Sequence, residues 1–266
     1  MLNWTAIDPG LLGPAFIAGV LVLATHVVLG IQVLDRGIVF IDLAIAQMAS
    51  LGVIVADTFG LPEGGVWMQA CAVVAALLGA ALLTWTERRA PRQQEALIGG
   101  AFVLATCAGI LLVSGNPHGG EHLRDLLIGQ ILWVDTPQLL GLAAVTAALL
   151  MAMRAGWLRR LGRFGFYGAF ALAVTASVQV VGVYLVFASL IFPALGTLGQ
   201  DGSRRHLVAL VSGIAGYASG LVLSALFDLP SGAVIVWTLA ACALICTGLR
   251  LVSSPGGDSH ADERRH

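Results

Sequence analysis

Long apolar runs alternate with short polar segments along almost the whole chain. Seven of these runs are about 20 residues long, which is the length that an α-helix needs to cross the hydrocarbon core of a bilayer. We expect them to form membrane helices over Pro14–Leu34, Ile38–Asp57, Val66–Thr86, Ala96–Ser114, Pro137–Met153, Leu207–Phe227 and Ala233–Val252. The pattern therefore predicts an all-α, polytopic membrane helical bundle.

Basic residues gather in some of the connections, and they mark these connections as cytoplasmic. They are Arg36, then Arg88, Arg89 and Arg92, then Arg154, Arg159, Arg160 and Arg163, and finally Arg204 and Arg205. An eighth apolar run, 164–199, has basic segments on both sides, so it must cross twice or dip and return. Gly182 is the expected break within it. The bundle then has nine crossings, or eight if this run is re-entrant, with the N-terminus outside and the C-terminus inside.

Composition supports the membrane prediction, because 58% of the residues are hydrophobic and only 11% are charged. Soluble domains contain about a quarter charged residues. The formal net charge of −1 gives no reason to expect a nucleic-acid partner. We assign residues 1–252 to one membrane domain and expect the polar tail 253–266 to be a disordered cytoplasmic segment.

Known enzyme motifs are absent from the sequence. It contains no phosphate-binding loop, no dinucleotide fingerprint, no HExxH and no GxSxG. The four cysteines lie inside apolar runs and are interpreted as small hydrophobic residues. We therefore expect no enzyme activity and no permanently bound cofactor, and any energy source other than an ion gradient must belong to another chain.

Four polar residues lie inside predicted membrane helices, where polar groups are costly and often functional. Asp42 is expected about 9 Å past Arg36, at a depth where a carboxylate needs a partner or contact with water. Gln47 follows on the same helix, and His26 and Gln179 lie on other helices. His26 has two interpretations, a functional group or a side chain that is hydrogen-bonded to a neighbouring helix.

Two further segments stand out between the fourth and fifth predicted helices. The external loop contains His118, Glu121 and His122, whose side chains suit zinc or manganese but also occur in ordinary solvated loops. The apolar piece Leu126–Val134 is too short to span the membrane. We expect it to be interfacial or re-entrant, and protected by protein rather than by lipid.

Four segments together resemble the permease subunits of ATP-binding-cassette (ABC) importers for zinc and manganese: residues 34–52, 129–134, 181–198 and 219–236. The resemblance implies a homodimer around a central path, two cytoplasmic ATPase subunits and an extracytoplasmic metal-binding protein. It also implies that the segment Pro193–His206 is the element that contacts the ATPase. Its expected coupling residues are Pro193, Gly196, Gly199, Arg204 and Arg205.

The second helix departs from the family pattern R-G-M-x-F-x-G-D-x-x-x-H. Leu43 and Gln47 stand at the positions of the family's Asp and His, and Asp42 comes one residue early. Asp42 and Gln47 are about 140° apart around a regular helix, so they cannot chelate one ion together. Either Asp42 holds the metal in another way, with His26 as a candidate second ligand, or the substrate differs.

The sequence thus predicts the permease subunit of an ABC importer for a divalent metal ion, namely zinc, manganese or iron, in a bacterial plasma membrane. The metal is expected as substrate, and the protein would work by alternating access. Asp42, Gln47, His26 and Gln179 would line the path. Alternatives are a permease for an iron chelate or a vitamin, a secondary transporter with Asp42 as proton carrier, and a non-transporting scaffold.

Overall fold

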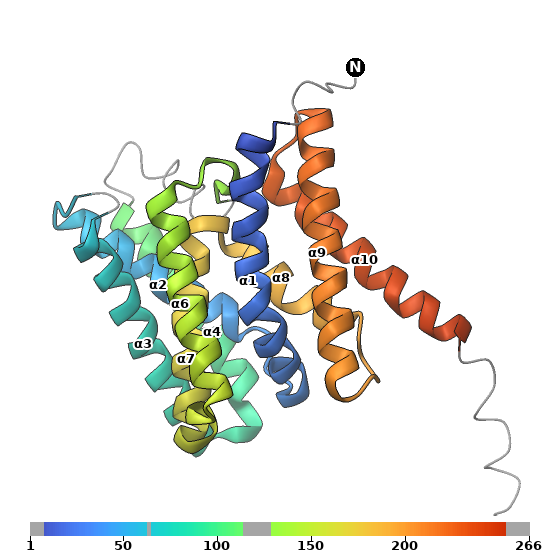
Figure 1. Ribbon diagram of the computed structural model, residues 1–266. Helices are drawn as coiled ribbons and strands as arrows, with labels where there is room; N and C mark the ends of the chain where they lie inside the picture. Colours follow the sequence, from blue (N-terminus) through green and yellow to red (C-terminus); the bar gives the residue numbers. More distant parts are fainter. Residues whose placement is uncertain (1–7, 63–64, 114–128, 254–266) are drawn as a thin grey trace, which may run out of the picture.

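The computed structural model describes residues 8–62, 65–113 and 129–253, and these residues form helices and no strands. Figure 1 shows the helices packed side by side as a bundle. Their bounds are α1 Pro9–Arg36, α2 Ile41–Thr58, α3 Val66–Arg89, α4 Gln94–Val113, α6 Thr136–Arg154, α7 Trp157–Val181, α8 Val183–Leu195, α9 Gly202–Phe227 and α10 Ser231–Ser253, with 3-10 turns η2 Pro91–Gln93 and η3 Ile131–Trp133. The predicted all-α bundle is confirmed.

Within the described residues, eight helices are long and apolar enough to cross a membrane, and α8 is shorter. The apolar run 164–199 divides at Gly182, as predicted, because this residue has φ 81° and ψ 163°, a conformation that favours glycine. The 13 residues of α8 extend about 20 Å, less than the hydrocarbon core of about 30 Å. The described part of the chain therefore has eight helices long enough to span a membrane and one short return helix.

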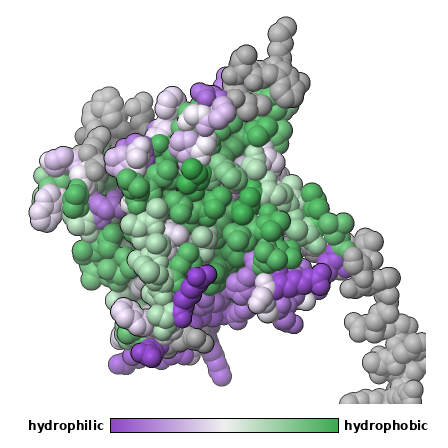
Figure 2. Space-filling model, viewed as in Figure 1, coloured by the Kyte–Doolittle hydropathy of each residue, from purple (hydrophilic) through white to green (hydrophobic). Residues whose placement is uncertain are grey.

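The two ends of the bundle differ in polarity. Arginines occupy the last turns of α1, α3, α6 and α10. Figure 2 shows an apolar band across the molecule and hydrophilic residues concentrated along its lower edge. The positive-inside rule makes this lower edge the cytoplasmic side. In Figure 1, α1 starts at the opposite, upper end and α10 runs down towards the cytoplasmic side.

The connection between α1 and α2 is longer than the sequence predicted. Gly37 ends α1 with φ 68°, and its N–H bonds to the carbonyl of Leu34. The N–H of Ile41 then bonds to the carbonyl of Ile38, which closes a turn before α2 begins. The predicted helix start at Ile38 is therefore wrong by three residues, and Asp42 lies in the first turn of α2.

Two basic segments that the sequence placed in loops are helical. Trp157 starts α7, and the non-helical backbone at Gly162 (φ 59°, ψ −130°) bends the helix before it enters the apolar region. Gly202 starts α9, so Arg204 and Arg205 lie in its first turns. These two basic segments continue the neighbouring apolar helix towards its N-terminus, because they contain no residue other than glycine that disfavours a helix.

The helices form two groups. Helices α3 and α4 pack on α2, and α8 and α9 pack on α1, while α7 contacts members of both groups. Glycines allow close approach in the second group: a Cβ at Gly30 would collide with the carbonyl of Leu190, and one at Gly19 with the ring of Tyr217. The hydroxyl groups of Tyr217 and Ser189 share a hydrogen bond of 2.7 Å, which links α9 to α8.

The short piece after the external loop packs against protein in part, since Ile131 is buried but Trp133 is 75% exposed. Gly129 has φ 70°, and a Cβ there would collide with the backbone of Val181 and Gly182. Ile131, in η3, is 1% exposed. The described part of this piece therefore lies against the α7–α8 break, whereas residues 126–128 and the tail 254–266 lie outside the described residues.

Candidate functional site

Several buried polar atoms inside the described membrane helices have no hydrogen-bond partner. They are Nε2 of His26, both carboxylate oxygens of Asp42, Oγ of Ser50, Oγ1 of Thr175 and Nε2 of Gln179. Leaving a buried polar group unsatisfied costs about 1–3 kcal/mol, and more when the group is charged. Because lipid offers no compensation, such groups are expected where they serve a substrate or ion pathway.

His26 is fully buried in α1, and both hydrogen-bond partners of its Nδ1 belong to the same helix. Its Nδ1 lies 2.9 Å from the carbonyl oxygen of Val22, which can only accept a hydrogen bond, and 3.1 Å from the hydroxyl of Thr25, which can donate or accept. In the tautomer in which Nδ1 donates to Val22, the neutral ring presents a lone pair at Nε2. Metal-binding histidines commonly have this arrangement, with the second ring nitrogen bonded to a carbonyl. The bond is made within α1 and not to a neighbouring helix.

Asp42 is 1% exposed, although it lies near the cytoplasmic end of α2. It is the acidic residue of the first turn of α2, where the helix dipole favours a negative charge. The expected depth of about 9 Å is too large, because α2 begins only one residue before Asp42. A buried carboxylate at this end can meet a cation that leaves towards the cytoplasm.

Asp42 and Gln47 face different neighbours. A Cβ at Gly109 of α4 would contact Ile54, so this side of α2 faces α4. Gln47 lies only about 20° from Ile54 around the helix, whereas Asp42 lies about 140° from Gln47. Gln47 is buried on the α4 side, and the two side chains do not converge on one point. Besides α3 and α4, helix α2 also packs on α7 and α8.

Thr175 and Gln179 lie one turn apart on the same face of α7. Thr175 is fully buried, and Gln179 is half-buried with its Nε2 enclosed. Thr175 is about 9 Å and Gln179 about 3 Å from the outer end of α7. His26 lies about 15 Å from the cytoplasmic end of α1, and Ser50 about 14 Å along α2. The unpartnered groups are therefore distributed from the cytoplasmic end to the outer end of the bundle.

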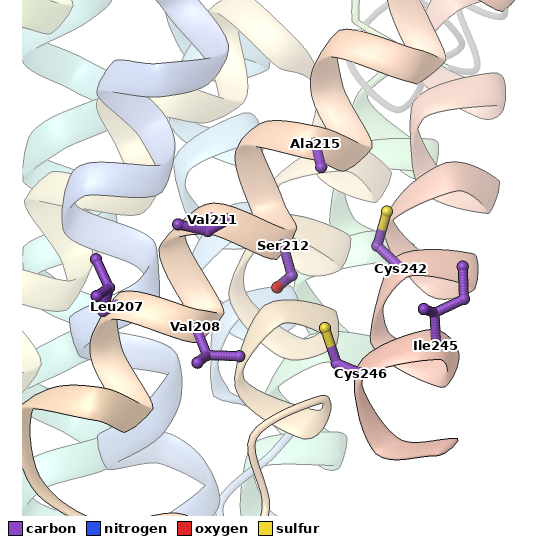
Figure 3. A pocket seen from close by; sticks show the side chains of 8 residues that line it. All are labelled: Leu207, Val208, Val211, Ser212, Ala215, Cys242, Ile245 and Cys246. Atoms are coloured by element: carbon purple, nitrogen blue, oxygen red, sulfur yellow. The ribbon is translucent and has the colours of Figure 1, made fainter. Parts of the chain in front are cut away.

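Two apolar grooves on the bundle are unsuitable for a cation. Figure 3 shows the groove between α9 and α10, with the thiols of Cys242 and Cys246 and the hydroxyl of Ser212 on its wall. Its volume is about 380 Å³, and its remaining lining is aliphatic. The Ser212 hydroxyl already bonds to the carbonyl of Ala209. A second groove of about 450 Å³, between α2 and α3, is also apolar.

The structure does not assemble the metal ligands that the sequence suggested. His118, Glu121 and His122 lie outside the described residues. Within the described residues, no group of three or more His, Cys, Asp and Glu side chains could hold a metal ion. By helix length Asp42 and His26 are at different depths, about 2 Å and about 15 Å from the cytoplasmic ends of their helices. No hydrogen bond joins Nε2 of His26 to the Asp42 carboxylate, and a metal site shared by the two residues stays a prediction.

The expected coupling residues lie together in the chain at the cytoplasmic end. Pro193 is inside α8, Gly196 ends it, and Gly199 has φ 73° in the following turn. A Cβ at Gly199 would collide with the guanidinium group of Arg250, so α10 lies against this turn. Arg204 and Arg205 follow at the start of α9.

Sequence reasoning missed several residues of this region. Ser50 and Thr175 gave no signal on their own, although Thr175 stands four residues before Gln179 and so shares its helix face. The contact between Asp35 and Arg205 joins residues 170 positions apart, and no local pattern could have revealed it.

A comparison with family models decides which family these features belong to. The model of the ABC 3 transport family matches residues 10–161 and 151–249, which is most of the chain. The chain belongs to the ABC 3 transport family. The described part of the chain contains eight long apolar helices. Together with the family membership, they show that the chain is a multi-pass membrane transport protein of the bacterial inner-membrane type.

Some relatives of this ABC 3 chain are named as membrane proteins of metal transport systems. A "Probable iron transport system membrane protein" of Haemophilus influenzae is 31% identical over 145 residues, 47% of this chain and 54% of that protein. The "Manganese transport system membrane protein MntC" of Halalkalibacterium halodurans is 24% identical over 242 residues, 84% of this chain and 81% of that protein.

A solved structure shows the same fold. The structure titled "PsaBC from Streptococcus pneumoniae in complex with Fab" matches with a TM-score of 0.72 and 21% identity. The match covers 91% of this chain and 95% of that one. The resemblance to ABC metal permeases is therefore confirmed at the level of family and fold.

Proposed function

We propose that this chain is the permease subunit of an ABC importer whose substrate is a divalent metal ion, with zinc, manganese and iron as the candidates. The single observation that carries this proposal is the set of unpartnered buried polar groups along α1, α2 and α7, which includes the Asp42 carboxylate. Membership in the ABC 3 transport family and relatives that are named for iron and manganese transport support it.

The proposed assembly has four kinds of partner. A separate cytoplasmic ATPase supplies energy through the segment Pro193–His206, and an extracytoplasmic binding protein delivers the metal. A second copy of the chain completes the path, and the bilayer surrounds it. Support comes from the family match and from the position of the segment between the cytoplasmic ends of α1 and α10.

In the proposed mechanism the metal passes inward along polar groups that have no competing partners. Gln179 and Thr175 come first, near the outer end of α7, then Nε2 of His26 and the hydroxyl of Ser50 at mid-depth, and finally Asp42. Gln47 is a secondary polar group on the other side of α2. The buried, closed arrangement of these groups in the described helices corresponds to one state of an alternating-access cycle.

Replacement of Asp42 by Asn tests this proposal. The change keeps the shape of the side chain but removes the negative charge, which contributes 1.5–3 kcal/mol or more to the binding of a charged partner. We expect metal uptake into cells that carry the complete transport system to fall about tenfold or more. Uptake of radioactive manganese and zinc at equal expression measures the effect.

Asp228→Asn is the matched control. Asp228 lies in the exposed α9–α10 turn with φ 52°, a conformation that Asn adopts readily. We expect this variant to transport at the wild-type rate. Unchanged uptake in Asp42→Asn at normal expression would contradict the assignment of Asp42 to the path.

A further inference from the structure

The cytoplasmic ends of α1 and α9 are joined by an ion pair. Nη1 of Arg205 donates to both carboxylate oxygens of Asp35, at 3.0 and 3.1 Å. The Arg205 side chain is only 12% exposed, whereas that of Asp35 is 54% exposed. The guanidinium group of Arg205 is buried to this extent at the edge of the bundle, so its position depends on the ion pair with Asp35.

On the Arg205 side, this contact holds the turn that connects α8 to α9. The turn contains Gly199 with φ 73°, and Gly202 with φ 65° starts α9. Arg250 of α10 lies directly against Gly199. The turn is therefore enclosed by α10 on one side. On the other side, Arg205, a few residues after Gly199 along the chain, bonds the start of α9 to α1. A displacement of the turn must move Arg205 with it.

On the Asp35 side, the contact reaches the connection that carries Asp42. Asp35 and Arg36 form the end of α1, and the guanidinium group of Arg36 lies 3.9 Å from the ring centre of Phe166 in α7. The short connection 37–40 follows, and α2 begins with Asp42 in its first turn. Asp35 thus stands next to contacts with α7 and a few residues from the buried carboxylate.

We propose that the Asp35–Arg205 ion pair is the positioning contact that transmits movement of the α8–α9 turn to the α1–α2 connection, and so to Asp42. This inference rests on the proposed function, in which the ATPase acts on the segment Pro193–His206. Neither residue touches the metal. Their role is to make the position of Asp42 depend on the position of the turn, because a bonded pair moves as a unit.

The test measures ATP hydrolysis and metal uptake on the same proteoliposomes, which contain the complete complex, its binding protein and manganese. Asp35→Asn should retain metal-stimulated hydrolysis but lower the metal taken up per ATP about tenfold, as expected for loss of a contacting charged pair. Arg205→Gln should lower the same ratio, and its rate of hydrolysis should fall as well because Arg205 belongs to the segment on which the ATPase acts. The exchanged variant Asp35→Arg with Arg205→Asp should recover to within about threefold of wild type. Arg205→Lys, which keeps the charge but not the geometry, should give an intermediate ratio.

Arg163→Gln is the matched control, since Arg163 forms a different cytoplasmic ion pair, with Glu87 at 3.4 Å, and is half-exposed. It should keep the wild-type ratio. Recovery in the exchanged variant would not occur if Arg205 acted only by docking on the ATPase. An unchanged ratio in Asp35→Asn, or no recovery on exchange, would overturn the inference while the proposed function stands. A wild-type complex without metal-stimulated hydrolysis would overturn the proposed function and this inference with it.

Discussion

At the scale of single residues, the buried polar groups of this protein divide into two kinds. Most serine and threonine hydroxyls bond to a carbonyl of their own helix, as Thr84 does to Ala80 at 2.7 Å. Thr175 is equally buried but has no partner. Hydroxyls of the first kind have a hydrogen-bond partner within their own helix. Hydroxyls of the second kind have no hydrogen-bond partner, which lowers the stability of the protein. We assign function to the second kind.

Thr175→Val distinguishes the two kinds, because valine has nearly the same shape but no hydroxyl. Removal of an unsatisfied buried hydroxyl should leave the free energy of unfolding unchanged or raise it by up to about 1 kcal/mol. Metal uptake should nevertheless fall about fivefold, since the path loses a polar group. Thermal unfolding in detergent and uptake in cells measure the two effects.

The comparison variant is Thr84→Val, which removes a hydroxyl that is bonded. It should lower the free energy of unfolding by about 1 kcal/mol and leave uptake per folded protein unchanged. The same loss of stability in both variants would show that Thr175 is a structural residue like Thr84.

The sequence identified the residues whose chemistry is unusual for a membrane helix, and it could not identify those that depend on tertiary contacts. Asp42, His26 and Gln179 stand out in an apolar run, and each proves to have an unpartnered buried atom. Whether their atoms lack partners is decided by neighbouring helices, so Thr175 and Ser50 remained unnoticed. The role of all these residues in transport stays a prediction.

At the scale of elements, the short helix α8 and the piece around η3 depend on each other. α8 can begin directly after α7 only because Gly182 breaks the helix there with φ 81° and ψ 163°. The bend leaves backbone groups that lipid could not satisfy, and the turn at Gly129 packs directly on Val181 and Gly182. The two segments are separated by about fifty residues in the chain and form one structural unit.

Gly129→Ala should destabilise this unit. A non-glycine residue with φ near 70° costs about 1–2 kcal/mol, and the added Cβ also collides with the backbone of the bend. We expect the midpoint of thermal unfolding in detergent to fall by about 5 °C or more.

Gly141→Ala serves as the control, because a Cβ at this position of α6 has no atom within 4 Å. Alanine favours the helix by up to about 1 kcal/mol, so this midpoint should stay constant or rise. Equal midpoints for the two variants would contradict the packing of Gly129 on the bend.

Helix order and direction could be predicted from the sequence because they follow from run length and arginine positions, whereas the number of crossings stayed open between eight and nine. Helix ends were less predictable. Because of the connection at Gly37, α2 starts three residues later than predicted. The basic segments before Phe164 and Leu207, which were predicted to be loops, are helical. In each case a turn or a neighbouring helix, and not hydrophobicity, decides where the helix begins.

At the scale of the whole molecule, the two groups of helices meet through α7, through the contact of α2 with α8 and through the end of α1. Asp35 binds α9 and Arg36 contacts α7, so adjacent residues of α1 contact both groups. The candidate path runs between them, since its polar groups belong to α1, α2 and α7. This arrangement suits a transporter in which one group moves relative to the other and the cytoplasmic end sets their positions.

The central claim is that this chain moves a divalent metal with energy from a separate ATPase. The most direct test is purification of the tagged chain in mild detergent, followed by an assay of ATP hydrolysis by the proteins that accompany it. The account predicts a stoichiometric ATPase whose hydrolysis rises when the binding protein carries one particular divalent metal. A chain that purifies alone and moves a cation into vesicles under a proton gradient would contradict the account, and Asp42 would then be the proton carrier of a secondary transporter.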